Sequence, residues 1–400
     1  MIRSKPLWFL TLLALVLGVA VGSLLPQVSL MTKPLGQLFL QALKLLVVPL
    51  VLVSITHAVG SVSQVGTAGR MGVLALVGYL VTTFMVIPTG FAVMALVKVN
   101  PMPGLGHSAE SVLSDEAAIE LGQLVPPNIV EAMASGNILG LIVFSLLLGV
   151  AANRAGSAGH AFREFMASAM AVVQGLTKIV IAFAPIGVFS LMASTTAQYG
   201  LEVLRPLVQL ILLVYVGCAL HVLITLNLGL RLFAKLSLWR FIQGVFPAQL
   251  MAFSTTTAAG TLPESMRCAE ENLHVKPFVS QFVLPVGATI NMDGTALYQL
   301  LVSLFVAQWY GIQLDLAQLV TLSLTVVLMS IGTAAIPSGG LVVLSAVLAS
   351  VGLPIEAVAL VAGIDRVLDM ARTTVNVTGD LAVTTIIDRQ ITRGDGAHDI

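Results

Sequence analysis

Charged side chains are scarce in this sequence. Of its 400 residues, 57% are hydrophobic and only 10% are Asp, Glu, Lys or Arg, whereas a soluble domain carries about 25% charged residues. A packed globule has no use for so much apolar surface, so the composition excludes a water-soluble protein and predicts one that lives in a lipid bilayer. The 19 basic and 19 acidic residues cancel, which argues against nucleic acid or another polyanion as a partner.

Cysteine and histidine are equally sparse. Cys218 and Cys268 are the only cysteines, and they fit neither a disulfide framework nor a metal site nor a redox motif. The six histidines show no ligand spacing, and no glycine-rich phosphate loop is present. His57 and His221 stand far in sequence from the charged stretch described below, so no nucleophile–base pair is visible and an enzyme is not expected.

Long uncharged stretches predict membrane-spanning helices, since about 20 apolar residues cross the hydrocarbon. The first stretch, from Pro6 to Thr32, starts like a signal peptide but is too long for one and lacks a convincing cleavage site. We expect six conventional spans, at about 7–25, 35–60, 71–97, 132–152, 171–194 and 206–230. The polar stretch 99–131 is predicted to be an external loop.

Basic residues give the orientation by the positive-inside rule. They lie at Arg3, Lys5, Arg70, Arg154, Arg163, Arg231, Lys235 and Arg240. These positions put the N-terminus and the segment near residue 235 in the cytoplasm, as six spans require. We expect a multi-pass protein of a cell membrane, such as a bacterial inner membrane, with both termini cytoplasmic.

From residue 241 onwards the apolar stretches are interrupted. "FIQGVFPAQLMAFSTTTAAGTLPESM" (241–266) has small and hydroxylated residues at its centre, and the uncharged stretch 316–355 contains "SIGTAAIPSGG", which cannot continue a helix. Two apolar halves joined by such a tip predict a re-entrant hairpin. The polar-centred spans 277–308 and 357–385 follow the two hairpins. This order is an approximate internal repeat, a pattern that points to a transporter's binding site.

Charge is concentrated in "DRVLDMARTTVNVTGD", residues 365–380. On a helix, Asp365, Asp369, Arg372, Asn376 and Asp380 fall within about 80° of one another and form one polar stripe. An Arg near the middle of a membrane helix costs at least ~2.5–3.5 kcal/mol on insertion scales. Arg372 therefore either receives a carboxylate in its planar fork or forms a structural pair with Asp369 or Asp365.

Four motifs carry a resemblance: "GTLPESMR" (260–267), "NMDGTALYQ" (291–299), "SIGTAAIP" (330–337) and "DMARTTVNVTGD" (369–380). They resemble the glutamate/aspartate and dicarboxylate:cation symporter family, in segment order over essentially the whole chain. The resemblance implies an all-α polytopic membrane protein with eight transmembrane segments, two re-entrant hairpins and inverted repeats. It also implies a homotrimer that works as an elevator. It divides the chain into six N-terminal helices (1–236, a scaffold plus part of the transport unit), a transport core (237–388) and a cytoplasmic tail (389–400).

The resemblance also implies the substrate contacts. Arg372 and Thr295 match the positions that hold the substrate's distal carboxylate, and Asp369 the one that holds an ammonium group. The full implied set is Arg372, Asp369, Thr373, Asn376, Thr295, Ala258, Ala259, Ile336 and Gly340. Arg372 with Asp369 points to aspartate or glutamate, and a C4-dicarboxylate is the alternative. Ala258 and Ala259 stand where the family usually has serines, and Thr256 and Met370 where relatives carry an extra Arg.

Sodium is the implied coupling ion, and no cofactor is expected besides it. The matching positions form three sets: Gly287, Asn291, Asn376 and Asp380; then Thr289, Ser330, Ile331 and Thr333; then Tyr79, Thr82, Thr83, Asn291 and Asp293. Buried Asp residues without a partner are costly, which favours bound cations. The alternatives are protonated or hydrogen-bonded carboxylates and coupling to protons. A charged stripe also suits an anion channel.

Overall fold

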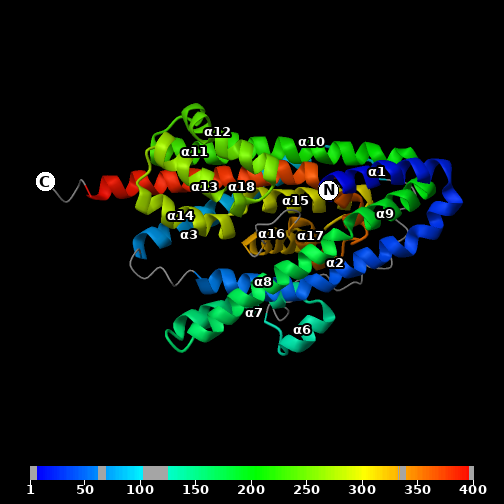
Figure 1. The fold of residues 1–400 in the computed structure, drawn as a ribbon, viewed down its shortest axis with the longest axis horizontal. Coiled ribbons are helices and arrows are strands. Elements are labelled where there is room, and N and C mark those ends of the chain that lie inside the picture. The colour runs from blue at the N-terminus through cyan, green and yellow to red at the C-terminus, as the bar shows by residue number, and fades with distance from the viewer. Residues whose placement is uncertain (1–6, 62–68, 102–124, 332, 334–338, 396–400) are drawn as a thin grey trace, which may run out of the picture.

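The computed structural model describes residues 7–61, 69–101, 125–331, 333 and 339–395, and these residues form helices and no strand (Figure 1). Five helical segments among them are long and apolar enough to cross a membrane: Pro26–Gly60, Met71–Ala95, His160–Ala182, Leu204–Ala234 and Pro277–Trp309. Shorter apolar helices accompany them at Phe9–Leu24, Ile138–Arg154, Leu316–Ile331 and Gly339–Ser350. The chain is a multi-pass helical membrane protein, as its composition predicts.

The first part of the chain supplies the outer helices. They are α1 (Leu7–Leu24), α2 (Pro26–Ser61), α3 (Gly69–Phe84), α4 (Val86–Ala95), α6 (Ile129–Ser135), α7 (Ile138–Arg154), α8 (His160–Ala182) and α9 (Ala184–Tyr199). A 3₁₀ turn, η3 (Leu201–Val203), leads into α10 (Leu204–His221), which continues through η4 (Val222–Leu226), α11 (Asn227–Gly229) and η5 (Leu230–Ala234). The segments η4 and η5 are π-helical, a form that is frequent at functional sites.

Two of the expected spans are each built from two helices. Pro88 has no N–H to offer the carbonyl of Phe84, the residue at which α3 ends. Pro185 likewise offers none to Ile181, and the break between α8 and α9 falls at Phe183. Together α8 and α9 cover His160–Tyr199 apart from that residue, so the predicted span 171–194 is too short at both ends.

Helix α2 starts at Pro26, well before the predicted span 35–60, and continues past Pro34. A side chain from α9 bridges its backbone next to Pro34. The Ser190 hydroxyl accepts a hydrogen bond from Gly36 N at 3.0 Å and donates one to the Thr32 carbonyl at 2.5 Å. A side chain inserted into the helix ladder replaces the bond that those two groups would otherwise make with each other. The sequence pattern around residue 34 gives no sign of this partner.

The second part of the chain forms two hairpins, a broken helix and a long last helix, and it confirms the predicted order. Its elements are α12 (Leu238–Thr255), α13 (Ala258–Arg267), η6 (Cys268–Asn272), α14 (Pro277–Ile290), α15 (Asp293–Trp309), α16 (Leu316–Ile331), α17 (Gly339–Ser350) and α18 (Ala357–Asp395). Thr256 ends α12 in the left-handed region at φ 55°, and the Thr257 hydroxyl caps α13 by accepting from Gly260 N. A two-residue turn therefore joins the arms of the first hairpin.

The broken helix α14–α15 forms the centre of the molecule. Its most apolar 18-residue stretch is entirely buried. Helix α18 packs against α12, α14, α15 and α10 (Figure 1). A second group consists of α1, α2, α7, α8 and α9, which pack on one another. Helix α17 contacts both α2 and α18, and α1 contacts both α9 and α18. The polar residues of α18 thus lie between the hairpins and the centre, with the second group close by.

Candidate functional site

Arg372 is the centre of a buried charged cluster on α18. Only 2% of the residue is exposed, and its Nη2 and Nε lie 2.7 and 3.1 Å from Asp369 Oδ1. Its Nη1 lies 3.9 Å from Asp365 Oδ1, and the guanidinium carbon lies 4.7 Å from the ring centre of Tyr298. Nη1 makes no hydrogen bond with any described residue. A buried donor left in this state is costly, so it offers strong binding to an incoming acceptor.

A small cavity of about 10 Å³ opens beside this guanidinium. It is lined by Thr256, Ala258, Met292, Thr295, Thr333, Gly340, Asp369, Arg372, Thr373 and Asn376. Seven of the nine residues expected to contact substrate are therefore brought together. Ala259 is exposed and does not line the cavity, and Ile336 lies outside the described residues. The volume suits one water molecule.

Asn376 connects the polar stripe of α18 to the break between α14 and α15. Its Oδ1 accepts hydrogen bonds from Gly294 N at 2.8 Å and Thr295 N at 3.3 Å, and its Nδ2 lies 3.2 Å from Thr295 Oγ1. The side chain thereby supplies acceptors to the first N–H groups of α15, which have no partner within the helix. Thr373 Oγ1 donates to Asp369 Oδ1 at 3.0 Å, and both residues line the cavity together with Arg372 and Asn376.

Two further buried carboxylates, Asp380 and Asp293, lie near the same break. Asp380 Oδ1 accepts from Asn291 Nδ2 at 3.0 Å, and Gly287 packs so closely that a Cβ there would lie 2.7 Å from Asp380 Oδ1 and 2.5 Å from the Tyr79 hydroxyl. Gly287, Asn291 and Asp380 of the first predicted ion set therefore lie next to one another.

Asp293 is held mainly by hydroxyl groups from α3. Thr83 Oγ1 and Thr82 Oγ1 donate to its Oδ1 at 2.7 and 3.2 Å, and Thr82 Oγ1 also lies 3.3 Å from Asn291 Oδ1. The Tyr79 hydroxyl instead donates to the Val283 carbonyl at 2.9 Å. The "YLVTT" stretch of α3 therefore does meet Asn291 and Asp293, far along the chain.

The second predicted ion set is less closely joined. Ser330 and Thr333 are buried at the end of α16, where their hydroxyls donate to the carbonyls of Val327 and Met329. Thr289 is exposed, and its hydroxyl donates to Val286 on its own helix. Helices α14 and α16, which carry Thr289 and Ile331, are in contact.

The sequence interpretation missed His221, which it set apart because of its distance along the chain. The structure corrects this: His221 Nε2 lies 3.4 Å from Asp293 Oδ2, and both side chains are fully buried. Its Nδ1 makes no hydrogen bond with any described residue. The available signal was a lone histidine in the middle of the predicted apolar span 206–230.

Arg366 is the second missed contact. Its Nη1 donates to the Thr256 hydroxyl and its Nη2 to the Ser254 carbonyl at 2.9 Å. The positions at which relatives carry an extra Arg are Thr256 and Met370 in this chain. A guanidinium nonetheless reaches the tip of the first hairpin, from Arg366 of α18. It also stabilises the C-terminal end of α12, where cations interact favourably with the helix dipole.

These features define a class of protein: a membrane transporter built from helical hairpins and broken helices around buried polar sites, and not an enzyme. The chain belongs to the sodium:dicarboxylate symporter family, whose family model matches residues 7–390. It is 33% identical over 395 residues to the proton/glutamate-aspartate symporter of Bacillus subtilis, covering 96% of this chain and 95% of that protein.

Two other relatives differ in their named substrates. The proton/sodium-glutamate symport protein of Geobacillus stearothermophilus is 32% identical, with 94% of this chain and 92% of that protein covered. The C4-dicarboxylate transport protein of Erwinia tasmaniensis is 31% identical, with 97% and 93% covered. The chain is therefore similar, at nearly equal identity, to proteins named for amino acids and for dicarboxylates.

Proposed function

We propose that this symporter takes up aspartate or glutamate together with sodium ions. The observation that carries the proposal is the buried guanidinium of Arg372, whose Nη1 has no hydrogen bond among the described residues and lines a polar cavity. A planar fork with a donor to spare matches a carboxylate of the substrate. Thr295 lines the same cavity and supplies a second contact to that carboxylate.

Asp369 is the proposed site for the substrate's ammonium group. Its carboxylate accepts from Arg372 and from Thr373. Because Asp369 lies about one helical turn before Arg372 on α18, it is next to the proposed carboxylate site. A C4-dicarboxylate offers nothing to this carboxylate, whereas an acidic amino acid offers an ammonium group. Thr373 and Asn376 are the proposed contacts to the head group, with the N-terminal turn of α13 at Ala258 receiving the α-carboxylate.

The proposed sodium ligands are the oxygens gathered around Asp380 and Asp293, together with carbonyls at the end of α16. Their hydroxyl, amide and carboxylate oxygens are hard ligands of the kind that alkali and alkaline-earth cations prefer. Proton coupling is the alternative, and one observation favours it: a buried His221 contacts Asp293. The names of two relatives likewise include the proton.

Transport requires movement, because a cavity of about 10 Å³ is far smaller than the ~300 Å³ or more of a typical ligand pocket. We propose that residues 237–388, with part of 1–236, move as a transport unit against a scaffold of α1, α2 and α7 to α9, in the manner of an elevator. The protein acts in this proposal as a homotrimer in a cell membrane, with both termini cytoplasmic.

Uptake by the reconstituted protein tests this function. Proteoliposomes are loaded so that sodium, potassium or proton gradients can be imposed separately, and uptake of labelled aspartate, glutamate and succinate is measured. The proposal expects aspartate or glutamate uptake that needs external sodium and rises with sodium more steeply than a single-ion hyperbola. Equal uptake without sodium under a proton gradient overturns sodium coupling, and preference for succinate overturns the amino acid assignment. Anion current with no coupled uptake would instead indicate a channel.

A further inference from the structure

A larger pocket lies apart from the small cavity, between the two groups of helices. Its volume is about 390 Å³. One wall comes from α1, α2, α8 and α9, and the other from α17 and α18. The residues that line it are Leu7, Thr11, Leu12, Phe39, Lys178, Ile181, Ala184, Leu341, Ala362, Gly363, Asp365, Arg366, Val367 and Met370.

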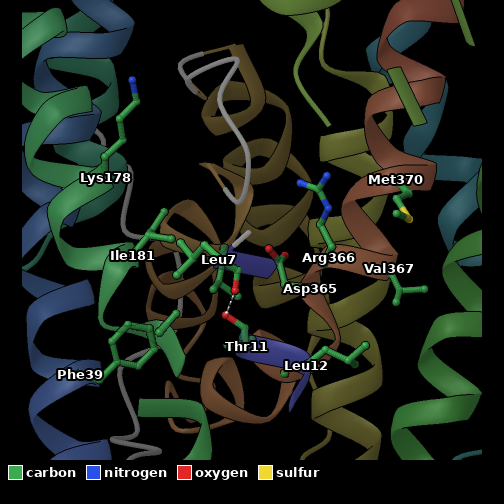
Figure 2. A pocket seen from close by; sticks show the side chains of 14 residues that line it. Leu7, Thr11, Leu12, Phe39, Lys178, Ile181, Asp365, Arg366, Val367 and Met370 are labelled. Atoms are coloured by element: carbon green, nitrogen blue, oxygen red, sulfur yellow. Dashed lines mark hydrogen bonds between the residues drawn. The ribbon is translucent and has the colours of Figure 1, made fainter. Parts of the chain in front are cut away.

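The pocket is apolar at one end and cationic at the other. Figure 2 shows Lys178 and Arg366 on opposite walls with their charged groups directed toward the same end, at the top of the view, while Leu12 and Phe39 lie toward the other end. The Thr11 hydroxyl donates to the Leu7 carbonyl at 3.0 Å, so it presents no free donor. Such a shape and polarity suit an amphiphile with one small charged head.

The charges at the pocket do not balance. Lys178 lies in a helix apolar enough to span the membrane and forms no ion pair with any described residue. Arg366 donates to two uncharged oxygens, those of Thr256 and Ser254, and its buried Nε has no hydrogen bond in the described part of the chain. Asp365 is the one carboxylate in the lining, which leaves one net positive charge. Lys178 is exposed and Arg366 is half-buried, so both cations are accessible to a ligand in the pocket, and a monoanion is the complement that neutralises the remaining charge.

The volume restricts the apolar part of the ligand. An apolar cavity of about 150 Å³ accommodates one benzene molecule, so a pocket of about 390 Å³ has the scale of a single hydrocarbon chain. Two chains of a phospholipid do not fit. The surrounding bilayer is the source of such chains.

We propose that this pocket binds a long-chain fatty acid as its carboxylate. The head group lies between Lys178 and Arg366, and the chain extends along Leu12 and Phe39. A ligand held by both walls stabilises the arrangement of the two helix groups in which the pocket exists. It therefore slows transport, a consequence that rests on the proposed movement of the transport unit, whereas the binding itself does not.

Binding is tested on the purified full-length protein in nanodiscs of uncharged lipid, with a photoreactive analogue of palmitic acid. The labelled peptides are identified by mass spectrometry. We expect labelling concentrated in α1, α2 and α18, displaced by palmitate and not by hexadecanol or phosphatidylglycerol. Lys178→Met reduces the apparent affinity roughly tenfold, as expected for the loss of one charge-assisted contact, whereas Lys178→Arg retains it. Leu12→Trp, which places a larger side chain in the apolar part of the pocket, abolishes labelling.

The matched control is Lys44→Met, because Lys44 is an exposed lysine on the membrane-spanning helix α2 and does not line the pocket. Its labelling stays at the wild-type level. Equal labelling of wild type and Lys178→Met, equal competition by hexadecanol or phosphatidylglycerol, or labels spread over the whole lipid-facing surface each overturn the proposal. Inhibition of uptake by palmitate, lost in Lys178→Met, checks the consequence for transport. Failure of uptake in every protein leaves the labelling result intact and counts only against the proposed function.

Discussion

Gly340 of α17 lies directly against the guanidinium of Arg372 of α18. A Cβ at residue 340 would stand 2.1 Å from Arg372 Nη1 and 2.7 Å from its Cζ. No side chain fits into that space unless the guanidinium moves. The N-terminal end of α17, the second arm of the second hairpin, therefore limits where the Arg372 guanidinium can lie. A side chain added at residue 340 must displace that guanidinium.

Gly340→Ala is expected to lower the affinity for acidic substrates at least about tenfold, since the added methyl displaces the guanidinium from the cavity. The measurement is the half-saturating aspartate concentration for uptake. Gly175→Ala is the matched control, because a Cβ there meets nothing within 4 Å. An unchanged half-saturating concentration in well-folded Gly340→Ala would show that the position of Arg372 does not govern binding.

Asp380→Asn and Asp293→Asn are expected to raise the sodium concentration needed for half-maximal uptake, roughly tenfold or more, because each removes a formal charge from a proposed cation site. Sodium titrations of aspartate uptake measure this. Asp388→Asn is the comparison: it is also a buried carboxylate of α18, but it accepts a hydrogen bond from Lys276 N. Its substitution is expected to reduce stability and leave the sodium midpoint in place. A common shift in all three variants would remove the specific role of Asp380 and Asp293.

Ser190→Ala is expected to destabilise the protein by about 1–3 kcal/mol, since Gly36 N and the Thr32 carbonyl both lose their partner. Thermal unfolding of the purified protein in detergent follows the effect. Ser194 is the control: it is also buried in α9, but its hydroxyl donates to the Leu191 carbonyl of the same helix. Ser194→Ala therefore loses one local hydrogen bond and should cost less, about 0.5 kcal/mol. Equal midpoints for the two variants would contradict the bridging role.

The parts of the site that local geometry determines could be predicted from the sequence. The stripe of Asp369, Arg372 and Asn376 follows from helical spacing alone, and the structure places all three on the cavity. The hairpins were also predictable, because glycine, proline and short polar residues cannot continue a helix between two apolar halves. In these cases the deciding physics acts within a few residues.

Contacts between distant helices could not be predicted in the same way. His221 lies 72 residues from Asp293 in sequence, and only the packing of α10 against α15 brings the two together. Ser190 contacts Thr32 of α2 across a still longer gap of 158 residues. Periodicity indicates which face of a helix is polar, but it does not state which partner that face meets.

The central claim is that Arg372 binds the substrate's distal carboxylate and Asp369 its ammonium group. The most direct test is the ratio of aspartate to succinate uptake, measured in Arg372→Cys, Asp369→Asn and wild type. The account predicts that Arg372→Cys loses aspartate and glutamate by roughly a hundredfold or more and gains small neutral amino acids. It predicts that Asp369→Asn loses amino acids far more than any succinate uptake. A structural Asp369–Arg372 pair predicts instead that both variants lose all substrates alike and that exchanging the two charges restores transport. An unchanged aspartate/succinate ratio in both well-folded single variants would contradict the account.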